Sequence, residues 1–241
     1  MEEMAKTSES MKTYIFYHCT TMGDYHQRFL KTYFKAKLSG LIDRCDRFFV
    51  CINGCKGSRF SQEFPQLSRP QESLFQIDDK IKTIIVSEEK HPNESVTANT
   101  IKYFCDGLED RANILYIHNK GVTKPNVINV QEWVDYMEYF VIEQWKDCLM
   151  KLRMSSKLCV GTEAKFGFGG DVWHYSGGFW WAQSEHIKTL PLCSDGYFDT
   201  EQWVLKPLEK EDFHSYMELN KEQMGFYNHR IKRKDYENVV E

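Results

Sequence analysis

Two sequence patterns that identify common nucleotide-using enzymes are missing from this chain of 241 residues. The segment after its first strand-like run, residues 17–24, contains one glycine, so the Gly-x-Gly-x-x-Gly fingerprint of dinucleotide-binding folds is absent. A Walker A loop is absent as well. These absences argue against hydride transfer with a dinucleotide and against NTP hydrolysis at a P-loop.

The sequence also lacks a long apolar run and a strong net charge. No stretch approaches the roughly 18 apolar residues of a membrane span, and residues 1–10 have no apolar signal-peptide core. A net charge of −4 argues against a broad nucleic-acid-binding surface. We therefore expect a cytoplasmic protein with no membrane span and no nucleic-acid partner.

The eight cysteines do not follow the spacing of a disulfide framework or of a zinc site. Cys19, Cys51 and Cys159 lie inside apolar runs, which favours reduced, buried thiols. Cys51 and Cys55 have no second pair at metal-binding spacing. Aromatic residues make up 15% of the chain, a high share that is typical of surfaces that stack on ring-shaped ligands.

Strand-like and helix-like segments alternate along the chain. Apolar or β-branched runs predict strands at residues 12–19, 47–54, 82–86, 113–117 and 157–161. Helical spacing predicts helices at residues 25–41, 95–108, 130–152, 184–190 and from residue 196. We leave residues 58–79 as a loop. The alternation predicts a single α/β domain with a central, mostly parallel but mixed sheet that is flanked by helices on both faces.

We expect the domain to divide by function along the chain. Residues 1–11 would be a disordered lead-in and residues 12–241 the domain, with a nucleotide-binding half at 12–125 and an acceptor-side half with the tail at 126–241.

The strongest sign of a ligand site follows the apolar run of residues 114–117. This predicted buried strand ends abruptly in His118, Asn119, Lys120 and Gly121. The carboxyl ends of strands form the ligand crevice of open α/β sheets, so these groups predict a site there. The alternative is an ordinary polar turn after a core strand.

Two motifs carry a resemblance to a known family. They are Tyr116-Ile-His-Asn-Lys-Gly121 and His174-Tyr-Ser-Gly-Gly-Phe-Trp-Trp-Ala182, with Trp133, Met137 and Phe140 between them. Over residues 12–206 the chain resembles small viral and bacterial glycosyltransferases of the GT-A type. It is similar to the nucleotide-sugar glycosyltransferases that large algal DNA viruses encode to decorate their capsid protein. The resemblance implies a UDP-sugar donor, a glycan or glycoprotein acceptor, and a divalent cation, Mn²⁺.

In that family an Asp-x-Asp motif holds the metal against the diphosphate, whereas this chain has His118-Asn119-Lys120 at the corresponding place. Lys120 could neutralise the diphosphate directly, and His118 could bind Mn²⁺ or donate to a phosphate. His229 is the second candidate metal ligand. Asp78 and Asp79 are interpreted as a solvated turn at the other end of the sheet. The full set of expected donor-binding residues is His18, Thr20, Asn53, Glu88, Asn93, Glu94, His118, Asn119, Lys120 and Gly121.

Transfer to a hydroxyl group requires a carboxylate base in an inverting enzyme, and Asp199 and Glu201 are the candidates, with His174 as a further catalytic candidate. Helix capping explains both acids without catalysis. The expected acceptor or sugar contacts are Gly177, Gly178, Trp180 and Trp133. Because tryptophan pairs mostly belong to cores, we expect either Trp180 or Trp181 to be buried.

Two alternatives to a glycosyltransferase stay open. A catalytically inactive nucleotide-binding or sugar-binding module of the same fold would explain the loss of Asp-x-Asp. A Rossmann-like methyltransferase is disfavoured by the glycine-poor first turn.

Overall fold

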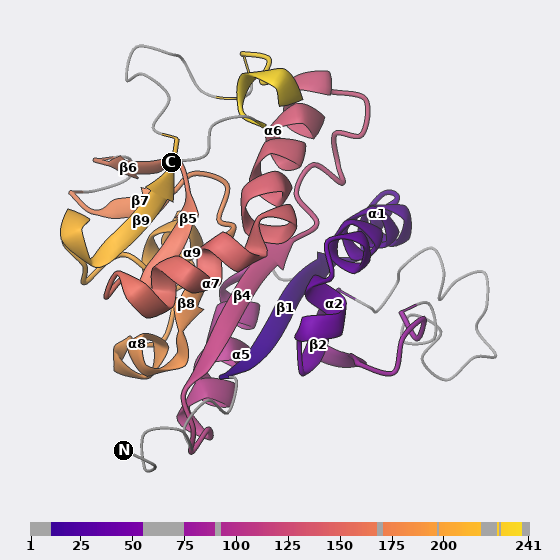
Figure 1. Ribbon diagram of the computed structural model, residues 1–241. Coiled ribbons are helices and arrows are strands. Elements are labelled where there is room, and N and C mark those ends of the chain that lie inside the picture. Colours follow the sequence, from indigo (N-terminus) through magenta and orange to yellow (C-terminus); the bar gives the residue numbers. More distant parts are fainter. Residues whose placement is uncertain are drawn as a thin grey trace.

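The computed structural model describes residues 11–54, 75–89, 93–167, 171–196, 198–217, 226 and 228–237 (Figure 1). Residues 1–10 of the expected lead-in and most of the expected loop at 58–79 lie outside these ranges.

Seven strands form one mixed sheet in the order β3-β2-β1-β4-β8-β5-β9. Their bounds are β1 Lys12–Thr20, β2 Arg47–Asn53, β3 Ile81–Ser87, β4 Ala112–His118, β5 Cys159–Thr162, β8 Trp180–Gln183 and β9 Phe213–Tyr216. Only β8 runs antiparallel to its neighbours, β4 and β5. A two-stranded sheet, β6 (Ala164–Phe166) and β7 (Trp173–Tyr175), lies apart from it. The predicted mostly parallel α/β sheet is confirmed.

The order of the strands reverses between β1 and β4. From β1 the chain moves outward to β2 and β3, and it then returns to the other side of β1 as β4. In the parallel register of β1 with β4, His18 lies opposite His118. Such a reversal leaves a crevice at the carboxyl ends of the two strands, where α/β proteins bind ligands.

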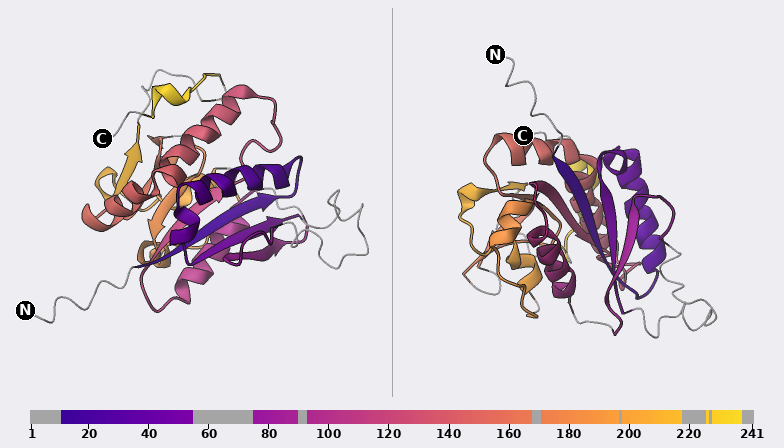
Figure 2. Two further views of the ribbon diagram at one scale, coloured as in Figure 1. Left: turned by 45° about the vertical axis from the view of Figure 1, so that its right-hand side comes forward. Right: turned by 90° about the horizontal axis from the view of Figure 1, so that it is seen from below.

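Helices cover both faces of the sheet, as predicted (Figure 2). Alternate strand residues point to opposite faces, so Ile15 and Tyr17 join one core and Tyr14 and Phe16 the other. The first core includes α1 (Tyr25–Leu38), α2 (Leu41–Arg44), α6 (Ile128–Glu138) and α7 (Trp145–Met154). The second includes α5 (Ser95–Asp106), α8 (Ser184–Thr189) and α9 (Asp199–Trp203).

The predicted helix at residues 25–41 ends earlier than its apolar spacing indicates. Gly40, with φ +79°, separates α1 from the short α2. Phe34 and Leu38 belong to the apolar residues at helical spacing in this range, but they are 54% and 88% exposed. Helical spacing therefore does not identify the buried face at these two positions.

The predicted helix at residues 130–152 is interrupted by a π-helical segment, η2 (Tyr139–Glu143), between α6 and α7. The carbonyl of Val141 in this segment accepts a hydrogen bond of 2.8 Å from the indole N–H of the buried Trp181. A π segment shifts the hydrogen-bond ladder by one residue. The local shift lets one helical stretch pack two differently oriented apolar faces.

The C-terminal segment packs on α6 and η2, where the short η4 turn (Arg233–Asp235) lies beside α6 (Figure 1). Arg233 pairs with Glu143 at 2.7 Å, and the Tyr139 hydroxyl donates to the carbonyl of Glu237. Another short helical turn, η3 (Lys210–Asp212), precedes β9.

The seven cysteines that the structure describes are buried free thiols, as predicted for Cys19, Cys51 and Cys159. Burial raises the pKa of Cys51 to about 12, which keeps the thiol protonated and unreactive. Within the described ranges, no helix has both the length and the apolar character needed to cross a bilayer.

Candidate functional site

Six of the seven strands end at the same edge of the sheet. The strands β1 to β4 are mutually parallel, β5 shares the direction of β4 because both are antiparallel to β8, and β9 is parallel to β5. The antiparallel β8 instead begins at this edge, directly after Gly177 and Gly178. Carboxyl-end residues of β4 and the glycines before β8 therefore meet, although they are almost sixty residues apart.

His118 joins three segments at this edge. Its Nδ1 lies 2.8 Å from a carboxylate oxygen of Glu94, which precedes α5, and its Nε2 lies 2.9 Å from the carbonyl oxygen of Gly177. Each ring nitrogen thus faces an oxygen atom that accepts hydrogen bonds. His118 thus ties the start of α5 and the turn before β8 to the end of β4.

Lys120 follows His118 by two residues, and its side chain is only 12% exposed. Its ammonium lies 3.8 Å from a carboxylate oxygen of Glu201 on α9 and 4.2 Å from the ring centre of Trp133 on α6. Such a cation over an indole is attracted by the ring quadrupole. We call Glu94, His118, Lys120 and Glu201 the strand-end cluster.

The pKa values of the two carboxyl groups of the strand-end cluster are shifted in opposite directions. Burial raises the pKa of Glu94, but the hydrogen bond and charge of His118 outweigh it, and the net pKa is lowered. For Glu201 burial is again the largest cause, and the charges of Lys120 and His118 do not offset it, so its pKa is raised. Burial lowers the pKa of Lys120, which Glu201 and Glu94 only partly oppose. Burial thus acts on both carboxyl groups, but only at Glu94 does a partner reverse its effect on the pKa.

Gly177 brings the backbone close to Trp133. Its φ is +92°, and a Cβ at this position would clash with the Met137 sulfur and come within 3.0 Å of the Trp133 ring. Gly121, with φ +77°, is similarly crowded by Val130 and Gln131 on α6. Only glycine fits both conformation and space, so these two positions set the distance between α6 and the strand ends.

Several expected donor-binding residues hold the strand ends together. Asn119 donates to the Thr20 carbonyl (2.7 Å) and accepts from the Thr20 backbone N–H (3.2 Å). His18 bonds the hydroxyls of Thr97 on α5 (2.7 Å) and of Thr20 (3.0 Å). Asn53 is fully buried, and its carbonyl accepts from the Thr21 backbone N–H. These hydrogen bonds fix the ends of β1, β2 and β4 relative to one another and to α5.

Two other expected donor-binding residues lie at the rim. Glu88 follows β3 and is exposed. Asn93 accepts from the Ser95 backbone N–H at 3.0 Å, and its amide donates to the Asp195 carbonyl at 2.7 Å. Asn93 thereby connects the start of α5 to the loop before α9.

The structure separates the two catalytic candidates on α9. Asp199 is the first helical residue, not the N-cap, and its carboxylate accepts from the Gly196 backbone N–H and the Ser194 hydroxyl. Glu201 points to Lys120 instead. Asp199 therefore has a structural role, because it holds the loop that precedes α9. Glu201 belongs to the strand-end cluster.

Two expected site residues are inside the protein. Trp180 and Trp181 are both fully buried, in opposite cores, so the expectation that only one is buried was wrong. Trp180 has no face available to a sugar. His174 is buried in the β6–β7 ladder opposite Lys165, with the Ser176 hydroxyl at 3.4 Å. Burial, together with the Lys165 charge, lowers the pKa of His174, so it is a neutral support of the turn that carries Gly177 and Gly178.

The expected metal ligands do not fit a divalent cation as they are arranged. Both nitrogen atoms of His118 lie within hydrogen-bond distance of protein oxygen atoms, so a metal ion at either nitrogen would have to displace one of these contacts. His229 is exposed in the C-terminal segment. Within the part of the chain that the structure describes, no three His, Cys, Asp or Glu side chains are grouped to hold a metal.

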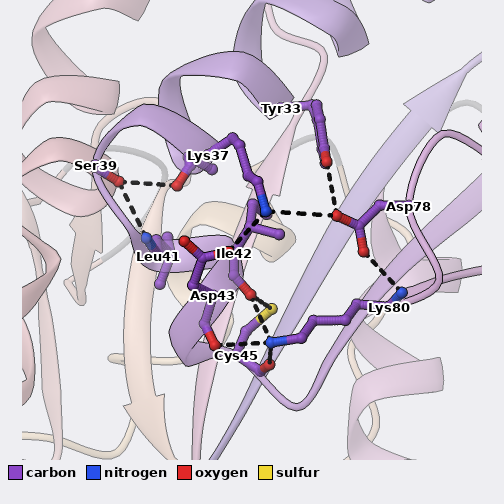
Figure 3. A network of polar contacts seen from close by, with 10 residues as sticks. Tyr33, Lys37, Ser39, Leu41, Ile42, Asp43, Cys45, Asp78 and Lys80 are labelled. Atoms are coloured by element: carbon purple, nitrogen blue, oxygen red, sulfur yellow. Dashed lines mark hydrogen bonds and ion pairs between the residues drawn. The ribbon is translucent and has the colours of Figure 1, made fainter.

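The acidic pair Asp78 and Asp79 lies before the amino end of β3, at the edge opposite the strand-end cluster, as the sequence indicated. Figure 3 shows the contacts of Asp78 and Lys80. Asp78 accepts from the Tyr33 hydroxyl (2.8 Å) and from the Lys80 backbone N–H (2.9 Å). The Lys80 ammonium donates to the carbonyls of Ile42, Asp43 and Cys45 at the end of α2. This network closes a helix end. The open hollow beside it, about 510 Å³, is lined in part by Lys37, Asp78 and Lys80, whose charged groups are paired within the chain.

Sequence reasoning missed Glu163. It directly follows β5 at the edge where six strands end, it is 1% exposed, and its φ is +52°. The signal that identified His118, a polar residue immediately after an apolar run, is present here too, because the predicted strand at 157–161 is followed by Thr162 and Glu163.

Comparison with known families decides the family of the chain. The profile of a domain of unknown function, DUF8361, matches residues 59–232, more than half of the chain. The chain belongs to the DUF8361 family. The matched range begins after β2 and contains every residue of the strand-end cluster together with Trp133, Gly177 and Glu163. No curated protein matches the chain.

Proposed function

We propose that this DUF8361 protein is a glycosyltransferase that moves a sugar from a nucleotide-sugar donor, a UDP-sugar by the resemblance of its motifs, to a glycan or glycoprotein acceptor. One observation carries the proposal. A largely buried ammonium, Lys120, and a carboxylate of raised pKa, Glu201, lie 3.8 Å apart where the strand order reverses. Transfer from a diphosphate leaving group to a hydroxyl needs one group of each kind.

Lys120 has the properties needed by the diphosphate side of the reaction. When the bond between the anomeric carbon and the diphosphate breaks, its electron pair stays on the phosphate oxygen. A cation already fixed in a site with little water stabilises that charge without reorganisation. Lys120 is held by Glu201 and by the Trp133 ring.

Glu201 has the properties needed by the acceptor side. In an inverting transfer, the acceptor oxygen attacks the anomeric carbon as Glu201 takes its proton, and the nucleoside diphosphate leaves. Burial raises the pKa of Glu201 toward the range in which a carboxylate is an effective base. A diphosphate bound at Lys120 would compete with Glu201 for the ammonium, so donor binding would release the base.

The test is a thermal-shift titration with UDP, GDP, CMP and S-adenosylmethionine, each with and without Mn²⁺, followed by turnover of UDP-sugars. A ligand at about 100 times its Kd adds roughly 2.7 kcal/mol to the folded state, an easily measured shift. We expect UDP to stabilise the protein without Mn²⁺ and a UDP-sugar to be consumed.

Each other outcome has a definite meaning. Stabilisation by UDP without turnover of any UDP-sugar would identify an inactive binding module. Stabilisation by S-adenosylmethionine alone would identify a methyltransferase. A strict requirement for Mn²⁺ would contradict Lys120 as the partner of the diphosphate.

A further inference from the structure

The ring of Trp133 has a second neighbour besides Lys120. Phe226, from the C-terminal segment, stacks on it with ring centres 4.7 Å apart and an interplanar angle of 10°. Phe226 is 6% exposed, so this contact removes a flat indole surface from solvent directly beside the strand-end cluster. The phenyl ring occupies the position that a flat ligand ring would take on Trp133.

Polar groups surround the Phe226 ring on the side of β5 and β9. The Lys165 ammonium lies 4.8 Å from its centre, and the Tyr136 ring lies 6.3 Å away. The Tyr136 hydroxyl donates to a carboxylate oxygen of Glu163 at 3.4 Å, and Lys165 lies 3.9 Å from the other oxygen. A phenyl ring makes no use of this carboxylate and ammonium as hydrogen-bonding groups, whereas a ring that carries hydroxyl groups would.

Glu163 also connects this region to the strand-end cluster. Its carbonyl accepts from the Ser176 backbone N–H at 3.1 Å, next to Gly177, whose carbonyl holds His118. A buried glutamate in the left-handed conformation, with φ +52°, is strained, and strain of this kind is concentrated at functional sites. Met217, at the end of the neighbouring β9, has φ +42° as well.

We propose that Phe226 occupies the acceptor subsite of the enzyme, and that the pyranose ring of a carbohydrate acceptor replaces it on Trp133. The apolar face of the pyranose stacks on the indole, and its hydroxyls bond Glu163 and Lys165. This inference rests on the proposed glycosyltransferase function. The subsite lies on the β5 and β9 side of Lys120, whereas the nucleoside of the donor is assigned to the ends of β1 to β3.

The position of the subsite gives Phe226 the properties of a built-in competitor. A sugar can bind only the molecules in which Phe226 has left Trp133. The apparent dissociation constant is therefore the intrinsic one divided by the fraction of such molecules. Removing the phenyl ring should therefore tighten acceptor binding, the reverse of the usual effect of shortening a side chain at a site.

The test measures binding of methyl glycosides of glucose, galactose, mannose, xylose and fucose by saturation-transfer NMR and calorimetry. We expect Phe226→Ala to bind at least one glycoside roughly two- to tenfold more tightly than the unaltered chain, the factor that corresponds to one aromatic pair. Adding Glu163→Gln to Phe226→Ala should reverse the gain. Phe34→Ala, which shortens an exposed phenylalanine on α1, is the matched control and should leave affinity unchanged.

A second variant guards against unfolding. Phe226→Leu keeps apolar volume but removes the flat ring, and it should show the same direction of change with a native melting temperature. Equal affinities in all variants, or no glycoside bound by any of them, would overturn the subsite. If UDP still stabilises the protein in that case, the proposed function survives. If UDP fails as well, the proposed function fails with it.

Discussion

Two buried charge clusters in this protein use similar groups in opposite ways. Between α1 and α6, the fully buried carboxylate of Glu138 accepts from Arg28 and Thr32 at 2.6 Å and from Lys35 at 2.7 Å. In the strand-end cluster, Lys120 and Glu201 remain 3.8 Å apart, beyond hydrogen-bond distance. The Glu138 carboxylate is bonded by three donors of its own chain, whereas Lys120 and Glu201 form no hydrogen bond with each other.

The pKa shifts express the same contrast. Burial raises the pKa of both Glu138 and Glu201, but the charges of Arg28 and Lys35 outweigh it at Glu138, whose net pKa is lowered. At Glu201 burial prevails, and its pKa is raised. Burial alone therefore does not decide whether the pKa of a buried acid is lowered or raised. The completeness of pairing does.

The largest expected effect on stability comes from breaking the Glu138 cluster. Glu138→Gln leaves Arg28 buried without a counter-charge, and we expect a loss of about 3–5 kcal/mol in the free energy of unfolding, measured in urea. Glu132→Gln is the matched control, because its partner Arg230 is half exposed and such pairs contribute less than about 1 kcal/mol. Comparable losses in both variants would remove the distinction between the Glu138 cluster and surface ion pairs.

Breaking the strand-end cluster should affect activity instead. Lys120→Met keeps the aliphatic stem over Trp133 but removes the charge, and we expect kcat for UDP-sugar turnover to fall about 100-fold or more. Stability should change by less than about 1 kcal/mol, because a desolvated ammonium is removed along with its attraction to Glu201. Lys124→Met, at an exposed lysine four residues later, is the control. A folded Lys120→Met variant with native turnover would move the active site elsewhere.

The same variant predicts the direction of a pH shift. Lys120 lowers the pKa of Glu201, so its removal raises that pKa further. Because the base acts when ionised, the acidic limb of the pH profile of residual activity should move to higher pH.

The next prediction concerns the close approach of Gly177 to α6. Gly177→Ala puts a side chain on a left-handed backbone and creates a clash with Met137. We expect the free energy of unfolding to fall by about 2–3 kcal/mol. Gly167→Ala separates the two causes, because Gly167 has φ +87° but nothing within 4 Å of a Cβ. The free energy of unfolding of the Gly167→Ala variant should fall by about 1 kcal/mol. Equal melting temperatures in the two variants would show that the turn before β8 relaxes away from Trp133.

The smallest effect is expected at Glu94. Its folded-state pKa lies below its ordinary value near 4.5, so it stabilises the protein above that pH, and the contribution is lost as the pH falls. Glu94→Gln should cost about 1–2 kcal/mol at pH 7 and flatten the loss of stability between about pH 5 and pH 3. Melting curves across that range provide the measurement. A parallel displacement of the two curves at every pH would show that the pair with His118 does not titrate with folding.

The strands and the edge at which six of them end were predictable from sequence, because buried runs such as residues 114–117 leave a clear apolar pattern and end in polar residues. Helix faces were less predictable. Phe34 and Leu38 follow helical spacing but are exposed, since spacing says nothing about which face meets the sheet. Trp180 and Trp181 point to opposite cores, as neighbours on a strand must, and each core accepts an indole.

The partners within the site were not predictable. Glu94 was expected to bind a donor, but its link to His118 depends on where α5 starts relative to β4. Asp199 and Glu201 are two residues apart and looked equivalent, and only the rotation of α9 turns Glu201 to Lys120. Phe226 and Trp133 are more than ninety residues apart, so their stacking requires the whole fold.

The π segment Tyr139–Glu143 has a consequence for how this family can change in length. Its hydrogen bonds span five residues instead of four, so the segment holds one residue more than a regular α-helix would. Each residue in an α-helix corresponds to about 100° of rotation. Deleting a single residue here would restore a regular helix but rotate α7 relative to α6, which would turn Leu149 and Leu152 out of the core while Trp133 stayed at the site. The interval between the site and α7 is therefore constrained to its present residue count, and relatives should place their insertions and deletions outside it.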